Sequence, residues 1–250
     1  MDSNSESREQ CVYGYLKSLC FCYWLNCFFV AMFEKRLSLD NLHIRPEEVY
    51  RQMGYGDKMP DERTAAEVKR LFTAASQIAV PRYCYMVLEG RLENDVLRMG
   101  EREFRLGHII ERQLAGATHF AVFVATAGTE YEEWRKRDNL LESFIADALG
   151  SVAVERCADD MEKDLQASID KLGWKRTNRF SPGYCEWATD EQRMLVPLLG
   201  NPNPCRVRLN ESALMWPVKS VSGIIGLGEN VSYHDYACRL CQLTHCFRRH

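Results

Sequence analysis

The sequence lacks an excess of charge of either sign. Its 32 lysines and arginines nearly balance 35 aspartates and glutamates, which gives a net charge of −3 and a pI near 6.1. Nucleic-acid and acidic-membrane binding usually leave a one-sided basic surface. The charge balance therefore implies neither a nucleic acid nor an acidic membrane as a partner. Apolar residues make up 46% and charged residues 27% of the chain, which is typical of a folded globular protein.

The sequence also lacks a long uninterrupted apolar run, and we expect no export signal in it. The most apolar segment, "CVYGYLKSLCFCYWLNCFFVAMF" from Cys11 to Phe33, is broken by Lys17 and Asn26 and follows the acidic flank "MDSNSESREQ". No small-residue cleavage site follows it, so a spanning helix and a signal peptide both fit poorly. We expect residues 1–31 to be an atypical apolar, cysteine-rich extension of a cytoplasmic protein. The alternative is membrane association or export.

No internal repeat, low-complexity tract or Walker A loop is present. The segment "GIIGLGENV" (Gly223 to Val231) is similar to a glycine-rich dinucleotide loop. That loop requires a following helix and a second strand that ends in an acidic residue about 20 residues on. Only 22 residues of this sequence follow Gly228, so we do not expect a Rossmann fold.

The chain from residue 46 onward alternates between helical and strand patterns. Helical spacing of apolar residues is followed by runs of aromatic and branched residues, and short strands joined by turns are expected after Trp174. Helices are predicted over 60–79, 107–117, 130–174 and 189–200, and strands over 82–90 and 118–128. Gly150 and Ser151 are expected to interrupt the long helix, for close packing or for a ligand. Thr189 is the expected N-cap and Gly200 the expected end of the last helix.

The segment "RFSPGY" (Arg179 to Tyr184) predicts a type II turn. Pro182 and Gly183 suit its two central positions, since the second requires a positive φ. Arg179 offers a planar fork for a carboxylate, and Tyr184 offers an aromatic face and a hydroxyl group. The segment indicates either an ordinary turn or a site for a zwitterionic or nucleoside-bearing ligand.

Together, "RFSPGY" and "ESALMWPVKSVSG" (Glu211 to Gly223) resemble the paired motif of the activation domain of cobalamin-dependent methionine synthase. In that family an Arg-x-x-x-Gly-Tyr turn binds S-adenosylmethionine, and an acidic-x-x-x-Met-x-Pro-x-x-Ser-x-Ser-Gly segment lines the same cleft. The resemblance implies an α+β fold, with a mixed or antiparallel twisted sheet and flanking helices, over residues 32–232. It also implies the family's chemistry, the reductive methylation of cob(II)alamin with S-adenosylmethionine as the methyl donor.

The resemblance further implies roles for individual residues. Arg179 would bind the carboxylate of S-adenosylmethionine. In the family an acidic residue on the helix before the turn helps to bind the ligand, and Glu155 would take that role here. The remaining implied contacts are the backbone of Ser181 and Gly183, the ring of Tyr184, and an adjacent wall of Ser220, Ser222 and Gly223.

The modules that bind homocysteine, folate and cobalamin have no counterpart, since no Asp-x-His-x-x-Gly motif occurs. We therefore expect a reactivation subunit of a methyltransferase system that acts in trans. Its expected partners are a separate cobalamin-dependent methionine synthase or other corrinoid protein, and a flavodoxin-type or ferredoxin-type electron donor.

The chain has 11 cysteines, an odd number that fits a reducing compartment better than a disulfide framework. Residues 233–250 form a cysteine-rich tail in which Cys238, Cys241 and Cys246 follow a C-x2-C-x4-C pattern, with His245 and His250 nearby. Three such ligands suit zinc or an iron–sulfur cluster if a fourth comes from elsewhere. Redox-active or inert buried thiols are the other interpretations. The alternative function is therefore a metal-binding or iron–sulfur interaction module with a vestigial ligand cleft.

Overall fold

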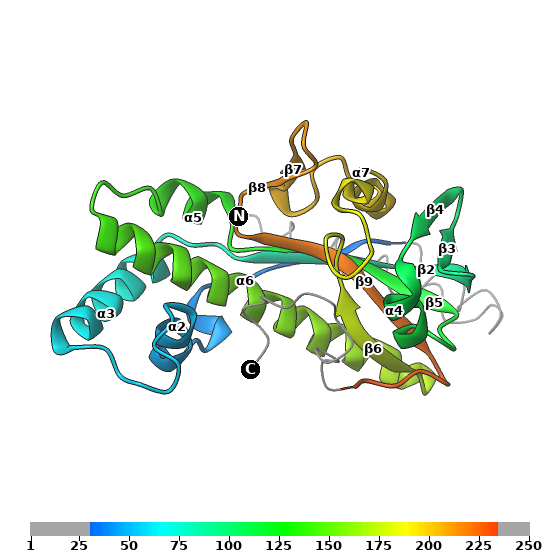
Figure 1. The fold of residues 1–250 in the computed structure, drawn as a ribbon, viewed down its shortest axis with the longest axis horizontal. Helices are drawn as coiled ribbons and strands as arrows, with labels where there is room; N and C mark the ends of the chain where they lie inside the picture. Colours follow the sequence, from blue (N-terminus) through cyan, green and yellow to red (C-terminus); the bar gives the residue numbers. More distant parts are fainter. Residues whose placement is uncertain (1–30, 235–250) are drawn as a thin grey trace, which may run out of the picture. The chain divides into compact units, whose positions relative to one another are not determined.

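The computed structural model describes residues 31–234, which Figure 1 shows as a ribbon. The chain divides into two units, residues 1–31 and 32–250, and the fold described here is that of the second. The predicted extension and most of the predicted tail lie outside the described residues.

An antiparallel sheet is the centre of the fold. Its strands are β1 (Phe33–Arg36), β2 (Arg82–Glu93), β3 (Val96–Met99), β4 (Arg102–Arg105), β5 (His119–Thr126), β6 (Lys175–Phe180) and β9 (Ser220–Gly228). The strand order is β4-β3-β2-β5-β9-β6, and β1 also pairs with β2. A separate hairpin consists of β7 (Arg208–Leu209) and β8 (Met215–Trp216). The expected α+β class with an antiparallel sheet is confirmed.

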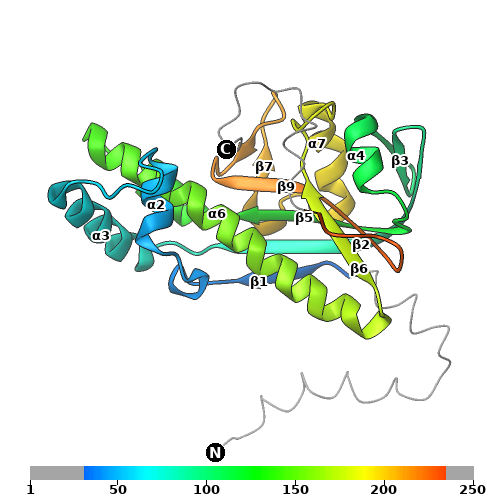
Figure 2. The same cartoon turned by 60° about the horizontal axis from the view of Figure 1, so that its bottom comes forward.

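Helices cover both faces of the sheet. They are α2 (Pro46–Gln52), α3 (Glu62–Ser76), α4 (Gly107–Gln113), α5 (Thr129–Trp134), α6 (Leu140–Ile169) and α7 (Gln192–Leu195). Short 3-10 turns are η1 (Asp40–Leu42), η2 (Asp170–Leu172), η3 (Thr189–Glu191), η4 (Val196–Leu199) and η5 (Pro204–Arg206). In Figures 1 and 2, α6 lies along one face with α2 and α3, and α7 lies with the β7–β8 hairpin on the other. Residues 120–126 of β5 are buried on both sides because both layers cover this strand.

The long helical segment is divided at a different place from the one predicted. α5 ends at Trp134, and α6 begins after Asn139, whose side chain accepts a hydrogen bond from Glu142 N–H at 3.1 Å. The helix then continues through Gly150 without a break. A Cβ at position 150 would lie 2.6 Å from the Tyr131 ring and 2.9 Å from the side chain of Lys219. Close packing therefore explains this glycine.

The segment 189–200 is not a single helix. Ala188 precedes η3 with extended backbone, and Thr189 is already inside the turn, so the predicted Thr189 N-cap is wrong. Pro197 cannot donate a backbone hydrogen bond, and the segment tightens from α7 into the 3-10 turn η4. Gly200 ends it with φ of 70°, as predicted.

Candidate functional site

The turn that follows β6 has the predicted geometry. Tyr184 N–H donates to the Ser181 carbonyl at 3.1 Å, and Gly183 has φ of 93°, so Pro182 and Gly183 occupy the central positions. Gly183 N–H also donates to the Trp187 carbonyl at 2.8 Å, which holds the turn against a buried tryptophan. Tyr184 is 39% exposed. The turn therefore presents an accessible aromatic ring from a well-held backbone.

A β-bulge in β6 places two arginines on the same face of the sheet. Arg176 pairs with Leu227 of β9, whereas Arg179 pairs with Ile225, so β6 has one extra residue between the two pairs. Residues three apart in a regular strand point to opposite faces. With the bulge, Arg176 and Arg179 both reach α6.

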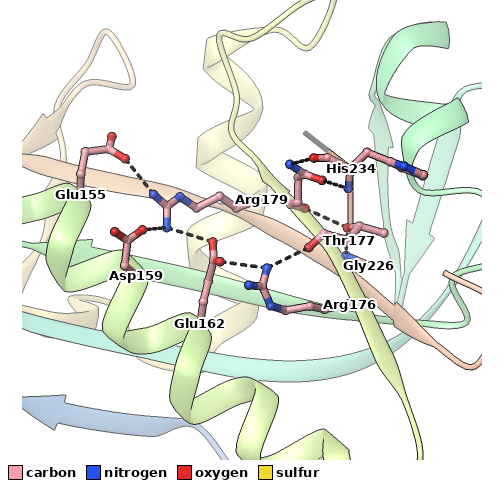
Figure 3. Close-up of polar contacts among 9 residues, drawn as sticks. Glu155, Asp159, Glu162, Arg176, Thr177, Arg179, Gly226 and His234 are labelled. Atoms are coloured by element: carbon pink, nitrogen blue, oxygen red, sulfur yellow. Dashed lines mark hydrogen bonds and ion pairs between the residues drawn. The ribbon is translucent and has the colours of Figure 1, made fainter. Parts of the chain in front are cut away.

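Arg179 is the centre of an ion-pair network with one face of α6 (Figure 3). Its guanidinium nitrogens lie 2.8 Å from Glu155 Oε2, 3.0 Å from Asp159 Oδ1 and 2.9 Å from Glu162 Oε1. These acids are spaced i, i+4 and i+7, so they follow one stripe of the helix. Arg176 lies 2.8 Å from the other oxygen of Glu162 and so shares this carboxylate with Arg179.

The network is buried at one end and open at the other. The side chains of Arg179 and Glu162 are each 12% exposed, whereas those of Glu155 and Asp159 are 40% and 42% exposed. Burial raises the pKa of Glu162, and the charges of Arg179 and Arg176 oppose that shift. The open end thus presents two accessible carboxylates beside the largely buried Arg179, a combination that suits the ammonium and carboxylate groups of an amino acid.

In the second predicted segment, Glu211 to Gly223, it is the backbone and not the serine side chains that lies close to the turn. A Cβ at Gly223 would overlap the Phe180 carbonyl oxygen, so this glycine allows β9 to approach the end of β6. Ser222 is 1% exposed, and its hydroxyl donates to Gln192 Oε1 in α7 at 2.8 Å. Ser222 therefore points into the layer opposite Arg179, and the structure does not bring these two side chains together.

Ser220, at the start of β9, belongs to a polar contact between strands. Its hydroxyl lies 2.8 Å from Thr126 Oγ1 and 2.7 Å from the Pro217 carbonyl oxygen. The neighbouring Lys219 lies 2.8 Å from Asp147 and 2.9 Å from the Ser151 hydroxyl of α6. The two serines of the expected wall thus contact β5 and α7, and it is Lys219 that ties this end of β9 to α6.

The sequence reasoning named Glu155 and missed Asp159, Glu162 and Arg176. The i, i+4, i+7 spacing of the three acids was a usable signal, because it places them on one helix face. The bulge that turns Arg176 and Arg179 to the same face had no comparable signal.

The predicted metal ligands Cys238, Cys241 and Cys246 lie outside the described residues. Within residues 31–234, no group of three or more histidine, cysteine or acidic side chains could hold a metal ion.

Of the helices in that same part of the chain, none has both the length and the apolar character needed to cross a membrane.

Comparison with known proteins identifies similar domains. The family model described as "Vitamin B12 dependent methionine synthase, activation domain" matches residues 91–242. Among solved structures, the chain is similar to the one titled "Crystal Structure of the MetH Reactivation Domain bound to AdoHcy". The two share 18% sequence identity with a TM-score of 0.60, over 82% of this chain and 80% of that one. The search of curated proteins found no match.

Proposed function

Because this chain belongs to the activation-domain family of vitamin B12 dependent methionine synthase, we propose that it binds S-adenosylmethionine beside the Ser181–Tyr184 turn. In this proposal the bound donor serves the reductive methylation of cob(II)alamin on a corrinoid protein. The observation that carries the proposal is Arg179, held at the base of the turn with two accessible carboxylates around it.

The amino-acid end of the donor would enter by exchange of ion pairs. Its carboxylate takes the place of Glu155 or Asp159 on the Arg179 fork, and the displaced side chain accepts the ligand's ammonium group. Each charge keeps an opposite partner during this exchange, which limits the cost of desolvation. Glu162 remains paired with Arg176 at 2.8 Å and is not displaced.

The turn would hold the rest of the donor. Tyr184 is exposed and offers a ring face to the sulfonium cation or to the adenine. The backbone of Ser181 and Gly183 fixes the direction in which the ligand leaves the arginine. These residues bind and orient the donor, so that its methyl group points away from the sheet.

In this proposal the cobalamin is bound by a separate corrinoid protein. When bound by that partner, cobalamin supplies the redox chemistry and the nucleophile that accepts the methyl group. We propose that the domain acts in trans, in the cytoplasm, on a cobalamin-dependent methionine synthase or related protein. A flavodoxin-type or ferredoxin-type protein would supply the electron.

Calorimetric titration with S-adenosylmethionine and with S-adenosylhomocysteine tests the binding site. Arg179→Gln removes a charged bidentate contact, so we expect a loss of about 2 kcal/mol, or roughly 30-fold in affinity. The control Lys136→Gln removes an exposed cation, 63% accessible, and should bind as the wild type does.

Equal binding by wild type and Arg179→Gln would refute the site. The absence of binding by the wild type would refute the function and favour the metal-binding interaction module instead.

A further inference from the structure

Two nitrogens of Arg179 hold the three acids of α6 unequally. Nη1 donates to Asp159 Oδ1 at 3.0 Å and to Glu162 Oε1 at 2.9 Å, whereas Nη2 donates to Glu155 Oε2 at 2.8 Å (Figure 3). Each Nη of a guanidinium carries two hydrogens. Both hydrogens of Nη1 are therefore engaged, and a ligand carboxylate can bond to this nitrogen only after Asp159 or Glu162 has moved.

Of these two acids, Asp159 is the one that can move. Glu162 is largely buried, and its second oxygen is held by Arg176 at 2.8 Å. Taking Glu162 away from Arg179 would weaken the pairing of a buried charge, which is costly. The side chain of Asp159 is accessible to solvent, so its charge remains hydrated when the contact with Arg179 is lost.

A second arginine lies beside the other oxygen of Asp159. Arg156, three residues earlier on α6, has its Nη1 3.8 Å from Asp159 Oδ2. Its Nη2 donates to Glu48 Oε1 in α2, and the second oxygen of Glu48 accepts from the Arg45 N–H at 2.9 Å, at the start of that helix. The guanidinium of Arg156 is thus anchored through one nitrogen, while the other lies near Asp159.

We propose that Arg156 is a positioning residue for the ligand and acts through Asp159, an inference that rests on the proposed function. When the ligand's carboxylate takes its place on Arg179, Asp159 turns toward Arg156. The separation of 3.8 Å then closes to the roughly 2.7–2.9 Å of a charge-assisted hydrogen bond. Oδ2 pairs with Arg156, and Oδ1 accepts the ligand's ammonium group.

The anchoring by Glu48 gives this arrangement its advantage. An acid that leaves Arg179 without a second cation would have many orientations, and fixing it on the ammonium group would cost conformational entropy. Arg156 is already held by α2 before the ligand arrives, so it offers Asp159 a defined place at a smaller cost.

Calorimetric titration of the full chain with S-adenosylmethionine and with S-adenosylhomocysteine tests the proposal. Arg156→Gln removes the cation that holds the displaced Asp159, so both ligands should bind roughly fivefold more weakly. Arg156→Lys keeps the charge and should restore most of the affinity. In the background of Asp159→Asn, Arg156→Gln should have no further effect on binding, because the carboxylate through which Arg156 acts is gone.

The variant Glu48→Gln separates positioning from a merely structural role. It breaks the same contact between α2 and α6 and should lower the unfolding temperature about as much as Arg156→Gln does. Arg156 remains beside Asp159 in this variant, so its affinity for both ligands should stay within about twofold of the wild-type value. Circular dichroism shows whether each variant is folded, and Arg156→Met replaces Arg156→Gln if the latter is not.

Three results would overturn the proposal while S-adenosylmethionine binding by the wild type stands. These are equal binding by wild type and Arg156→Gln, an equal loss of affinity in Glu48→Gln, or an undiminished effect of Arg156→Gln in the Asp159→Asn background. A wild type that binds neither ligand would overturn the proposed function and this inference together, so the two failures are distinguishable.

Discussion

The Arg179 network should stabilise the fold as well as bind a ligand. In the variant Arg179→Gln, Glu162 keeps its 2.8 Å pair with Arg176 but loses the contact with Arg179 at 2.9 Å. Breaking a fully buried ion pair costs about 3–5 kcal/mol. Here one cation remains and two of the acids are accessible, so we expect a loss of about 2 kcal/mol in the free energy of unfolding. That is a large share of a typical stability of about 5–15 kcal/mol.

The loss of stability in Arg179→Gln should depend on pH. Burial raises the pKa of Glu162, so the native state binds its proton more tightly than the unfolded state does, and stability falls as pH rises through this range. The charge of Arg179 opposes this shift. Without Arg179 the pKa of Glu162 rises further, and the stability of the variant falls more steeply with increasing pH. At acidic pH, where Glu162 is protonated in both proteins, the difference between them becomes smaller.

Urea unfolding of Arg179→Gln, Glu162→Gln and the double variant, at several pH values, measures both effects. We expect a coupling energy of about 1 kcal/mol near neutral pH. Lys136→Gln, which breaks an exposed pair with Glu133, is the control and should change stability by less than about 0.5 kcal/mol. A coupling energy near zero, or a difference that does not vary with pH, would refute the account of this network.

Two other predictions concern the surroundings of the site. Gly223→Ala places a methyl group against the Phe180 carbonyl, so we expect a loss of about 1–3 kcal/mol in thermal or urea unfolding and weaker ligand binding, because β6 must move. Unchanged stability would mean that the strands do not approach this closely. Arg82, 2% exposed, holds the pKa of Glu130 at about 2, so this pair stabilises the fold above the ordinary glutamate pKa, an effect that fades as pH falls toward 2. Glu130→Gln should lower stability near pH 7 by about 2 kcal/mol and flatten its decline in acid, and an unaltered acid profile would contradict this.

The local parts of the site could be predicted from the sequence. The Pro182–Gly183 turn follows from the backbone preferences of two residues, and the paired motif named Arg179 as a candidate ligand contact. The sheet face to which each strand side chain points was harder to predict, because it depends on the register of the strand. Ser222 was expected beside Arg179, yet it points to the opposite layer and bonds to Gln192.

The partners of Arg179 depend on two features that come from tertiary packing. One is the bulge between Arg176 and Arg179, and the other is the rotation of α6 that turns Glu162 toward them. Neither follows from propensity or apolar spacing. The break in the long helix was likewise misplaced, because the glycine at 150 serves contact with Tyr131 rather than interruption of the helix.

Transfer of a labelled methyl group tests the central claim most directly. S-adenosylmethionine labelled in its methyl group is incubated with this protein, a chemical reductant and a cob(II)alamin-loaded corrinoid protein that lacks its own activation domain. The account predicts label on the cobalamin only when this protein is present, and a large loss of transfer with Arg179→Gln. If this protein binds S-adenosylmethionine but the cobalamin of the corrinoid protein stays unlabelled, the account is contradicted.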